Sequence, residues 1–466
     1  MHHYIACDLG AESGRVMLGT LADGKITLKE IHRFPNNAVV VNGTRRWDVL
    51  RIFDELQTGV RKVDVKAESL STDSWGVDYV WLKDNEPMLT APYQYRDART
   101  HDYEKWFATV PAETIFAETG IQFMHINTLY QLAADPAWVW KTADRFLMIG
   151  DYINYLFSGV AKAEESLAST SQIYNPKKHA WSKKLIRGFK FNKRVFPDIV
   201  PSGTVLGDYN GLKVIATCSH DTGAAIAAVP AAGKGWAYLS SGTWSLLGIE
   251  AKKPIINEKS RQYNFTNEVG HGGSIRFLKN IIGLWIQQEC RRAWNNKYSY
   301  VELAQLAAQC APLKSLINPN DPRFGTPDNM PGKIADFCRE TGQPVPATEG
   351  EFIRCILESL ALLYRRTLDQ LEDVTGKPIK TLHIVGGGSQ NVLLNQFSAN
   401  ATGRTVVAGP AEATATGNIL LQAIALGHLK DLDELRQVVR NSFEVKTYKP
   451  QADWQAAYER FQKLVK

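Results

Sequence analysis

The sequence predicts an α/β protein with two similar halves, on three observations. The first half is expected to run strand, strand, strand, helix, strand, and a related plan recurs near the middle of the 466-residue chain. Each half opens with a hairpin whose tip carries small residues, at Asp8–Arg15 and at Ser240–Thr243. A Pro/Gly/Ala segment, Pro230–Gly235, separates the halves. We therefore expect domains at 1–232 and 233–466, with a ligand bound in a cleft between them.

The elements of the first half follow from its apolar pattern. Short apolar runs predict strands, and apolar residues at Ile52, Leu56 and Val60 predict a helix capped by Asp48. The expected strands are Tyr4–Cys7, Val16–Leu18, Ile26–Ile31, Ser69–Thr72 and Leu212–Ala216, and a buried helix is expected from Ala224.

The second half is expected to continue its hairpin with α/β units. The expected strands are Gly235–Leu239, Trp244–Ile249, Thr381–Val385 and Thr405–Ala408, and an Ala-rich helix is expected at about Asn418–Leu426. Because strands and helices alternate here, we expect an α/β half with phosphate-type turns of its own.

The composition indicates a globular protein and not a nucleic-acid binder. Apolar residues make up 44% of the chain and charged residues 22%, so a large core is available. The net charge of +6 is small for this length, and we interpret the densest basic stretch, Phe189–Arg194, as a solvated face. A nucleic-acid binder is expected to show a basic stripe or a known module.

The cysteines and the N-terminal segment predict a reduced, cytoplasmic enzyme. The six cysteines are Cys7, Cys218, Cys290, Cys310, Cys338 and Cys355, and no pair has C-x-x-C or metal-finger spacing. Several stand in apolar segments, where cysteine acts as a small hydrophobic residue. Neither a signal peptide nor a membrane span is expected.

The turn Asp8–Arg15 has the composition of a site for phosphate and a divalent cation. Its glycines allow backbone N–H groups to approach an anion, and Arg15 offers a planar fork of donors. A carboxylate beside a phosphate site, here Asp8, suggests Mg²⁺ or a water bound to it. The alternative is an ordinary surface turn with a salt-bridged Arg15.

Asp221 is the candidate general base. It lies in the segment Cys218–Gly223, between a predicted strand and a predicted helix, where α/β sheets place reactive groups. A carboxylate there could accept a proton from a substrate hydroxyl. The alternative is a cap for the following helix. A triad of Ser219, His220 and Asp221 is not expected, because adjacent side chains rarely aim at one another.

Three consecutive glycines, Gly386–Gly388, follow a predicted strand. They leave room for a large flat group, such as a base or ribose, and a flexible turn is the alternative. They are not a dinucleotide fingerprint, because Asn391 stands where the last glycine is required. A dehydrogenase is therefore not expected. The chain also lacks a Walker-type phosphate loop.

The segment Asp73–Asp78, at the end of another predicted strand, is a candidate sugar site. Trp75 could stack on a sugar, Gly76 could expose backbone to it, and Asp78 could accept hydrogen bonds from hydroxyls. The alternative is a core tryptophan and a turn aspartate. The segment Arg96–Arg99 either frames the same pocket or forms a structural ion-pair cluster.

Together these segments resemble the FGGY family of carbohydrate kinases, within the actin-like (ribonuclease H-like) ATPase superfamily. The resemblance rests on Asp8–Gly10, Ser219–Thr222, Ser240–Thr243 and Gly386–Gly388, and it runs nearly from end to end. Further matching strings are Ser13–Leu18, Glu30–Phe34, Trp75–Asp78, Tyr95–Asp97, Asn127–Leu132, Tyr238–Ser245, Leu278–Ile281, Ile317–Asp321 and His383–Gly388.

The resemblance implies two actin-like ATPase domains, the N-terminal one holding the sugar and the base and the C-terminal one the nucleotide. It implies phosphate transfer from ATP, with Mg²⁺, to O1 of L-rhamnulose; L-fuculose or xylulose is the alternative substrate. Asp221 would be the base, and Asp8 would hold Mg²⁺, through water. The implied sugar contacts are Gly76, His220, Asp221, Thr222 and Asn280, and the implied ATP contacts are Ala11, Glu12, Ser13, Gly14, Arg15, Thr243, Gln288 and Gly387.

Two features depart from the family pattern. Glu12 stands where a small residue is common, and its carboxylate should repel a triphosphate unless it points away or helps to organise Mg²⁺. The second family signature is poorly formed at Phe277–Trp285, which favours the branch acting on L-rhamnulose over a generic assignment. A non-catalytic sensor of nucleotide and sugar is the alternative from another class, and Asp8 and Asp221 argue against it.

Overall fold

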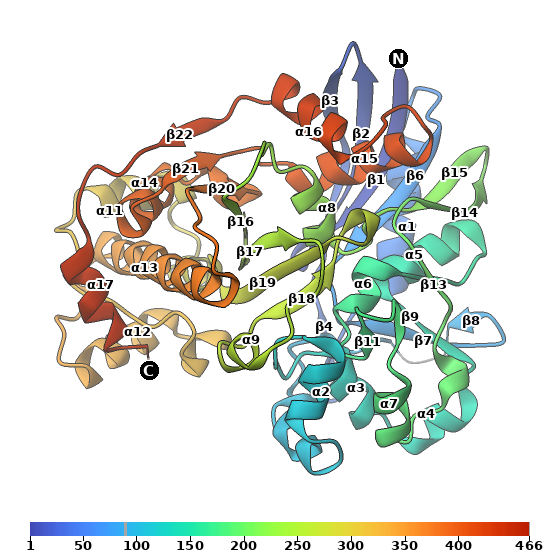
Figure 1. Ribbon diagram of the computed structural model, residues 1–466, viewed down its shortest axis with the longest axis horizontal. Coiled ribbons are helices and arrows are strands. Elements are labelled where there is room, and N and C mark those ends of the chain that lie inside the picture. The colour runs from blue at the N-terminus through green and yellow to red at the C-terminus, as the bar shows by residue number, and fades with distance from the viewer. Residues whose placement is uncertain (88–90, 466) are drawn as a thin grey trace. The chain divides into compact units, whose positions relative to one another are not determined.

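The structure is a computed structural model of the chain that describes residues 1–87 and 91–465, and it divides into two compact units (Figure 1). Unit 1 comprises Met1–Ala228, Glu250–Phe277 and Ala413–Ser442. Unit 2 comprises Val229–Ile249, Leu278–Glu412 and the chain from Phe443 onward. Unit 1 therefore takes in two segments from the second half of the sequence.

Unit 1 is built on a mixed sheet in the order β14-β15-β6-β1-β2-β3. Its strands are β1 (His2–Leu9), β2 (Ser13–Ala22), β3 (Lys25–Pro35), β6 (Ser69–Ser74), β14 (Thr204–Tyr209) and β15 (Leu212–Ala216). Strands β1, β2 and β3 form an antiparallel meander, whereas β6 runs parallel to both β1 and β15. Because parallel strands end at the same edge of a sheet, the segments that follow β1, β6 and β15 meet there.

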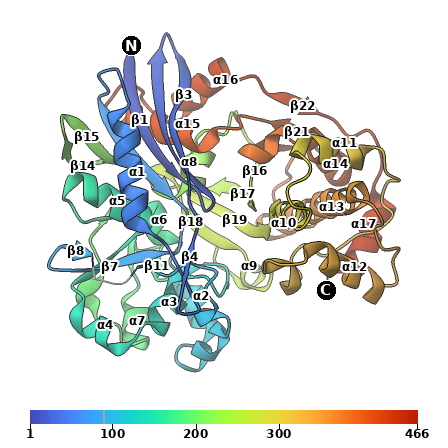
Figure 2. The same ribbon diagram turned by 180° about the vertical axis from the view of Figure 1, so that it is seen from behind.

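Helices cover both faces of this sheet. They are α1 (Val49–Arg61), α5 (Ile149–Ser158), α8 (Asp221–Ala227), α15 (Ala413–Ala425) and α16 (Leu432–Ser442). Helix α15 lies in front of β1 and β6 in Figure 1, and α1 lies in front of the sheet in Figure 2. The carboxylate of Asp48 accepts a hydrogen bond from the backbone N–H of Arg51 at 3.2 Å, which confirms the predicted helix cap.

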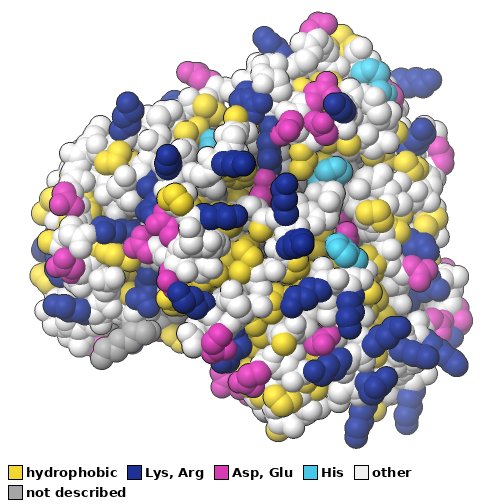
Figure 3. Space-filling view, in the orientation of Figure 1, with side chains coloured by type: hydrophobic (Ala, Val, Ile, Leu, Met, Phe, Trp, Pro, Cys, Tyr) yellow, Lys and Arg dark blue, Asp and Glu magenta, His cyan; other side chains and the backbone are white. Residues whose placement is uncertain are grey.

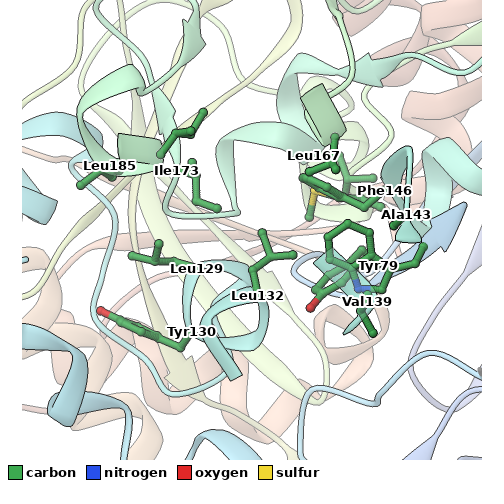
Figure 4. Packing of buried hydrophobic residues seen from close by; sticks show 14 of the residues in the cluster. Tyr79, Leu129, Tyr130, Leu132, Val139, Ala143, Phe146, Leu167, Ile173 and Leu185 are labelled. Carbon is green, nitrogen blue, oxygen red and sulfur yellow. The ribbon is translucent and has the colours of Figure 1, made fainter. Parts of the chain in front are cut away.

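A second core of unit 1 is rich in aromatic side chains (Figure 4). It gathers Leu129 and Tyr130 of α3, Tyr79 of β7 and Phe146 of β9, all nearly inaccessible to solvent. This core anchors β7, the strand that follows the turn at Gly76. The remaining elements of unit 1 are β4 (Val39–Val41), β5 (Thr44–Arg46), β7 (Tyr79–Lys83), β8 (Glu86–Pro87), β9 (Arg145–Met148), β10 (Ala163–Glu164), β11 (Tyr174–Asn175), β12 (Ala180–Trp181), β13 (Ile199–Val200), β18 (Thr266–Val269), α2 (Ala112–Thr119), α3 (Thr128–Ala134), α4 (Ala137–Thr142), α6 (Glu165–Ser169), α7 (Lys183–Gly188) and α9 (Glu258–Gln262).

Unit 2 contains the strand order β17-β16-β20-β21-β22. Strands β16, β20 and β21 are parallel, and β17 returns antiparallel to β16 as the second strand of a hairpin. Its strands are β16 (Trp236–Ser241), β17 (Trp244–Ala251), β19 (Ile275–Ile282), β20 (Thr381–Val385), β21 (Thr405–Ala408) and β22 (Lys446–Tyr448); the chain passes between the units inside β17 and β19. Its helices are α10 (Trp285–Ala293), α11 (Tyr300–Ala308), α12 (Met330–Glu340), α13 (Glu349–Thr375), α14 (Val392–Thr402) and α17 (Gln455–Gln462).

The predicted strands and helices occur in the predicted order in both halves, and the structure differs from the prediction in detail. The short hairpin β4–β5 goes beyond the prediction, because Val39–Val41 is exposed and has no buried face to give it a strand pattern. Helix α8 begins at Asp221 and not at Ala224, because Asp221 and Thr222 already have helical geometry.

Charged side chains are spread over the visible face, with both signs interspersed (Figure 3). The densest group of Lys and Arg lies at the lower right, where Figure 1 places α7. On that helix Lys183, Lys184 and Arg187 are exposed. All six cysteines lie in the described part of the chain, and none forms a disulfide. A search of the described helices finds none that is long and apolar enough to cross a membrane.

Candidate active site

The tip of the β1–β2 hairpin is a tightly closed turn. Asp8 and Arg15 face each other across the hairpin, and the Arg15 guanidinium donates a hydrogen bond to the Asp8 carboxylate. The backbone N–H of Gly10 donates to the carbonyl of Ser13 at 3.0 Å. Asn36, just after β3, donates to the carbonyls of Gly10 at 2.8 Å and Glu12 at 2.9 Å. The tip is therefore fixed before any ligand arrives.

The residues of the tip differ in exposure. A Cβ at Gly14 would lie 2.2 Å from the ring of Phe34, so Gly14 is required for packing between β2 and β3. Ala11 and Ser13 are half-buried, and Glu12 is exposed. The Glu12 carboxylate is therefore in contact with water, which screens its charge.

Two carboxylates lie side by side at the edge of the sheet. Asp8 is paired with Asp73 in the parallel register of β1 and β6, so both side chains emerge on the same face. Asp73 is completely buried. Its Oδ2 accepts a hydrogen bond from Asn418 at 2.6 Å, whereas its Oδ1 has no partner within the described residues. Burial, together with the charges of Asp8 and Asp221, raises the pKa of Asp73 well above its usual range.

A buried amide chain on α15 holds Asn418 in place. Gln422 donates to the side-chain oxygen of Asn418 at 2.8 Å and to the carbonyl of Ile5 at 2.9 Å. Ser69 donates to the side-chain oxygen of Gln422 at 2.6 Å. Because the side-chain oxygen of Asn418 already accepts the hydrogen bond from Gln422, its NH₂ group must face Asp73. Helix α15 can approach this closely because residue 417 is glycine: a Cβ there would lie 1.8 Å from the carbonyl oxygen of Ala224 on α8.

Asp221 has one carboxylate oxygen held and one available. It is the first residue of α8, and its Oδ1 accepts hydrogen bonds from the N–H of Thr222 at 2.5 Å and the hydroxyl of Thr222 at 3.1 Å. Its Oδ2 accepts no hydrogen bond from the described residues, and the side chain is 29% exposed. Burial, and to a smaller extent the charge of Asp8, raises the pKa of Asp221, while the hydrogen bonds from Thr222 oppose that rise.

The loop that carries Asp221 is joined to the end of β6. The backbone N–H of Ser74 donates to the carbonyl of Ser219 at 2.9 Å, and Ser74 forms a parallel bridge with His220. The turn containing Gly76 follows directly. A Cβ at Gly76 would lie 3.0 Å from the hydroxyl of Thr170, so the turn has little room for a side chain. The structure thus brings Gly76, His220, Asp221 and Thr222 to one edge of unit 1.

Asp78 does not supply the sugar contact that its position in the sequence suggests. Its carboxylate accepts four hydrogen bonds from the protein and is completely inaccessible to solvent. The donors are the indoles of Trp47 at 2.6 Å and Trp75 at 3.0 Å, the N–H of Tyr95 at 3.1 Å, and Gln131 at 2.9 Å. Asp78 therefore has a structural role, because it joins the segments that carry these four donors. Arg99 likewise pairs with Asp135 at 2.6 Å, which favours the structural alternative for that segment.

The β16–β17 hairpin of unit 2 positions helix α10. The carbonyl of Thr243 accepts hydrogen bonds from Gly283 at 3.1 Å and Trp285 at 3.2 Å, and that of Gly242 accepts one from Leu284 at 3.0 Å. Gln288 lies in the first turns of α10, and its side-chain oxygen is buried without a hydrogen-bond donor within the described residues. Such an acceptor is suited to a bound ligand with an N–H or O–H group.

The three glycines after β20 have different roles. Gly386 has φ of 83°, which favours glycine, and a Cβ at Gly388 would lie 2.0 Å from the hydroxyl oxygen of Ser241. Gly387 is exposed, and a Cβ there would meet nothing within 4 Å. Gly387 is thus the one member of the triplet that presents bare backbone to an open space.

The sequence-predicted site residues are divided between the two units. Asp8, Ala11–Arg15, Gly76 and His220–Thr222 belong to unit 1. Thr243, Asn280, Gln288 and Gly387 belong to unit 2. Asp73 and Asn418 go beyond the predicted set. The signal for Asp73 is its place at the end of a predicted strand, as for Asp8, but its pairing with Asp8 depends on strand register.

Comparison with known proteins identifies the family of each half of the sequence. A model of the FGGY family of carbohydrate kinases, N-terminal domain, matches residues 3–226, and the C-terminal domain model of the same family matches residues 237–426. The chain is 42% identical over 485 residues to a rhamnulokinase of Bacteroides thetaiotaomicron, covering 100% of this chain and 99% of that protein. It is 41% identical over 477 residues to a rhamnulokinase of Bacillus subtilis, covering 99% of this chain and 98% of that one.

Solved structures confirm the predicted fold class. A ligand-bound xylulose kinase from Lactobacillus acidophilus is similar with a TM-score of 0.81 at 17% identity, over 100% of this chain and 96% of that one. A glycerol kinase from Plasmodium falciparum with ADP gives a TM-score of 0.78 at 14% identity, over 99% and 97% of the two chains. From the two domain matches and the full-length relatives, we conclude that this chain belongs to the FGGY family of carbohydrate kinases.

Proposed function

We propose that this chain is a sugar kinase that transfers the γ-phosphoryl group of ATP to O1 of L-rhamnulose, giving L-rhamnulose 1-phosphate and ADP. The observation that carries the proposal is the geometry of Asp221, one oxygen held by Thr222 and the other available at the edge of the sheet. The substrate follows from the curated relatives, which are named rhamnulokinases. A kinase that draws on ATP is expected to work in the cytoplasm.

In the proposed reaction, Asp221 acts as the general base. Its free Oδ2 accepts the proton of the O1 hydroxyl while that oxygen attacks the γ-phosphorus, and ADP leaves. The hydrogen bonds from Thr222 keep the carboxylate from rotating. The Gly76 turn and His220 supply further contacts to the sugar, and Asn280 is proposed to join them.

The phosphates are proposed to bind at the two hairpin tips. In unit 1 we assign the phosphates to the turn Ala11–Arg15, with its backbone N–H groups and the Arg15 guanidinium as the proposed donors. In unit 2 we assign Thr243 to the phosphates, the open backbone of Gly387 to the nucleoside, and Gln288 to a polar group of the nucleotide.

The residues around Asp8 fit a divalent cation. Asp8, Asp73 and Asp221 repel one another, and the unpartnered Oδ1 of Asp73 is an acceptor with nothing to accept. Carboxylate oxygens are the ligands that Mg²⁺ prefers, directly or through water. Asp8 and Asp73 would hold the ion, which when bound offsets negative charge on the phosphates.

If Asp73 helps to hold the cation, Asp73→Asn should change the thermal stability of the protein, which can be measured without any assay of activity. Without a cation, the variant should be more stable than the parent protein by about 1–2 kcal/mol, because a buried, repelled charge is removed while Asn418 keeps an acceptor. The increase in Tm on adding Mg²⁺ or Mn²⁺ should in turn be smaller. Thermal unfolding with EDTA and with each metal measures both effects.

Asp198→Asn is the matched control, because that carboxylate is exposed and, among the residues the structure describes, forms a surface ion pair with Lys162 alone. Its metal-dependent change in Tm should equal that of the parent protein. If Asp73→Asn were less stable without metal and kept the full metal effect, the cation assignment would be wrong.

Release of ADP over a panel of ketoses tests the proposed function. With Mg²⁺ and ATP, L-rhamnulose should give the highest kcat/KM, with L-fuculose and D-xylulose turned over more slowly. A preference for L-fuculose or xylulose would overturn the substrate but keep the kinase. If no sugar is phosphorylated while ATP still binds, the sensor alternative is favoured.

A further inference from the structure

We propose that Arg276 is a positioning residue that fixes His220 in its neutral form, with the ring hydrogen on Nε2, beside Asp221. Only the consequence for catalysis rests on the proposed function. The state of the imidazole itself follows from the side chains around it.

Arg276 lies in the part of β19 that belongs to unit 1 and is 1% exposed. Its Nη2 is 3.0 Å from Nδ1 of His220 and 3.1 Å from Oε2 of Glu268. Its Nε donates to the carbonyl of Val269 at 3.2 Å. The guanidinium is therefore held from two sides, and its position against the imidazole is fixed.

The donor and acceptor inventory decides the protonation of His220. A guanidinium has only N–H donors and keeps its proton in proteins, so at 3.0 Å the Nδ1 of His220 has to accept. A hydrogen on Nδ1 would point at another N–H. The single ring hydrogen is therefore on Nε2, and the ring is uncharged.

The neighbouring carboxylate of Glu268 explains why His220 needs Arg276 to stay neutral. Its Oε2 is 3.3 Å from Nδ1 of His220 and would attract a proton to that nitrogen if Arg276 were absent. With Arg276 present, the same oxygen forms an ion pair with the guanidinium at 3.1 Å instead. Arg276 thus prevents Glu268 from turning His220 into an imidazolium.

The consequence for catalysis lies on the other side of the ring. Nε2 of His220 is 3.4 Å from Oδ1 of Asp221. A full positive charge at that distance would stabilise the carboxylate and make it a weaker base. A neutral ring leaves Asp221 basic and keeps an Nε2–H group that can donate to an oxygen of the sugar.

A buried arginine is unfavourable for stability at position 276, which supports a role for Arg276 in function. Its Nη1 is buried and has no hydrogen-bond partner within the described residues. Burying a cation with one nitrogen unsatisfied is unfavourable, and apolar residues fill such positions at lower cost.

The experiment is nitrogen NMR of the full chain labelled with ¹⁵N-histidine. The signals of His220, one of ten histidines, are assigned from their loss in His220→Gln. At neutral pH, Nδ1 is expected to show the shift of an unprotonated nitrogen and Nε2 that of a protonated one. In Arg276→Met, Nδ1 should become protonated, and in Arg276→Lys the parent pattern should return at least in part.

Arg436→Met is the matched control, because it also removes a buried arginine paired with a glutamate in unit 1, here Glu250 at 2.8 Å. It should leave the His220 signals unchanged. In kinetics, Arg276→Met should lower kcat by about 10–100-fold, with the KM for ATP nearly constant.

A protonated Nδ1 in the parent protein would overturn the proposal, and so would an unprotonated Nδ1 in folded Arg276→Met. If Arg276→Met does not fold, the parent spectrum and Arg276→Lys still decide. Because the spectra need no substrate, they distinguish failure of this proposal from failure of the proposed function, which the ketose panel measures.

Discussion

Asp221→Asn is expected to lower kcat by about 10²–10⁴-fold while leaving the affinity for ATP nearly unchanged. The substitution keeps an oxygen for the hydrogen bonds from Thr222, so the start of α8 should remain folded. It removes the lone pair of Oδ2 that the proposed mechanism uses. Steady-state kinetics with L-rhamnulose, and titration with a fluorescent ATP analogue, measure the two quantities separately.

The pH profile of the parent enzyme belongs to the same prediction. Burial and the charge of Asp8 raise the pKa of Asp221 above its usual range. The base works only when deprotonated, so kcat/KM should fall as pH drops through that raised value, at a higher pH than for an ordinary aspartate. Asp198→Asn, an exposed carboxylate, should keep the parent rate and profile. A rate for Asp221→Asn within a few-fold of the parent would show that another group takes the proton.

Gly417→Ala is expected to have the largest effect on stability, about 2–3 kcal/mol. The new Cβ would lie 1.8 Å from the carbonyl oxygen of Ala224, so the backbones of α15 and α8 must separate. Because α8 begins with Asp221 and α15 carries Asn418, both the base and the support of Asp73 should shift. Urea unfolding and kcat should therefore change together.

Gly325→Ala is the control for a glycine whose Cβ has room. Its nearest neighbour would be a carbon of Ile282 at 3.8 Å, an ordinary van der Waals contact. We expect a change in unfolding free energy of no more than about 1 kcal/mol, in either direction. If Gly417→Ala were equally mild, the close packing of α15 on α8 would not be what positions Asp221.

Local pattern was enough to predict much of the fold and part of the candidate site. The two hairpins, the capped helix α1 and the strands β15, β20 and β21 depend on periodicity and turn residues that a reader of the sequence can see. Asp221 could be predicted as the general base because it stands between a predicted strand and a predicted helix.

The remaining features depend on contacts between distant parts of the chain. Asn418 lies 345 residues from Asp73, and nothing near it in the sequence indicates that α15 packs in unit 1. Asp78 looked available because its four donors come from other segments, such as Trp47 and Gln131. Arg276 looked like any strand residue, since its role depends on the placement of His220 and Glu268.

The most direct test of the central claim is a single-turnover experiment with excess enzyme, [γ-³²P]ATP and L-rhamnulose, for the parent protein and Asp221→Asn. The parent should convert the label into L-rhamnulose 1-phosphate with one ADP for each phosphate transferred. Asp221→Asn should bind the same amount of ATP and transfer phosphate at least about 100-fold more slowly. Equal transfer rates, or label released only as inorganic phosphate by the parent enzyme, would contradict a sugar kinase that uses Asp221 as its base.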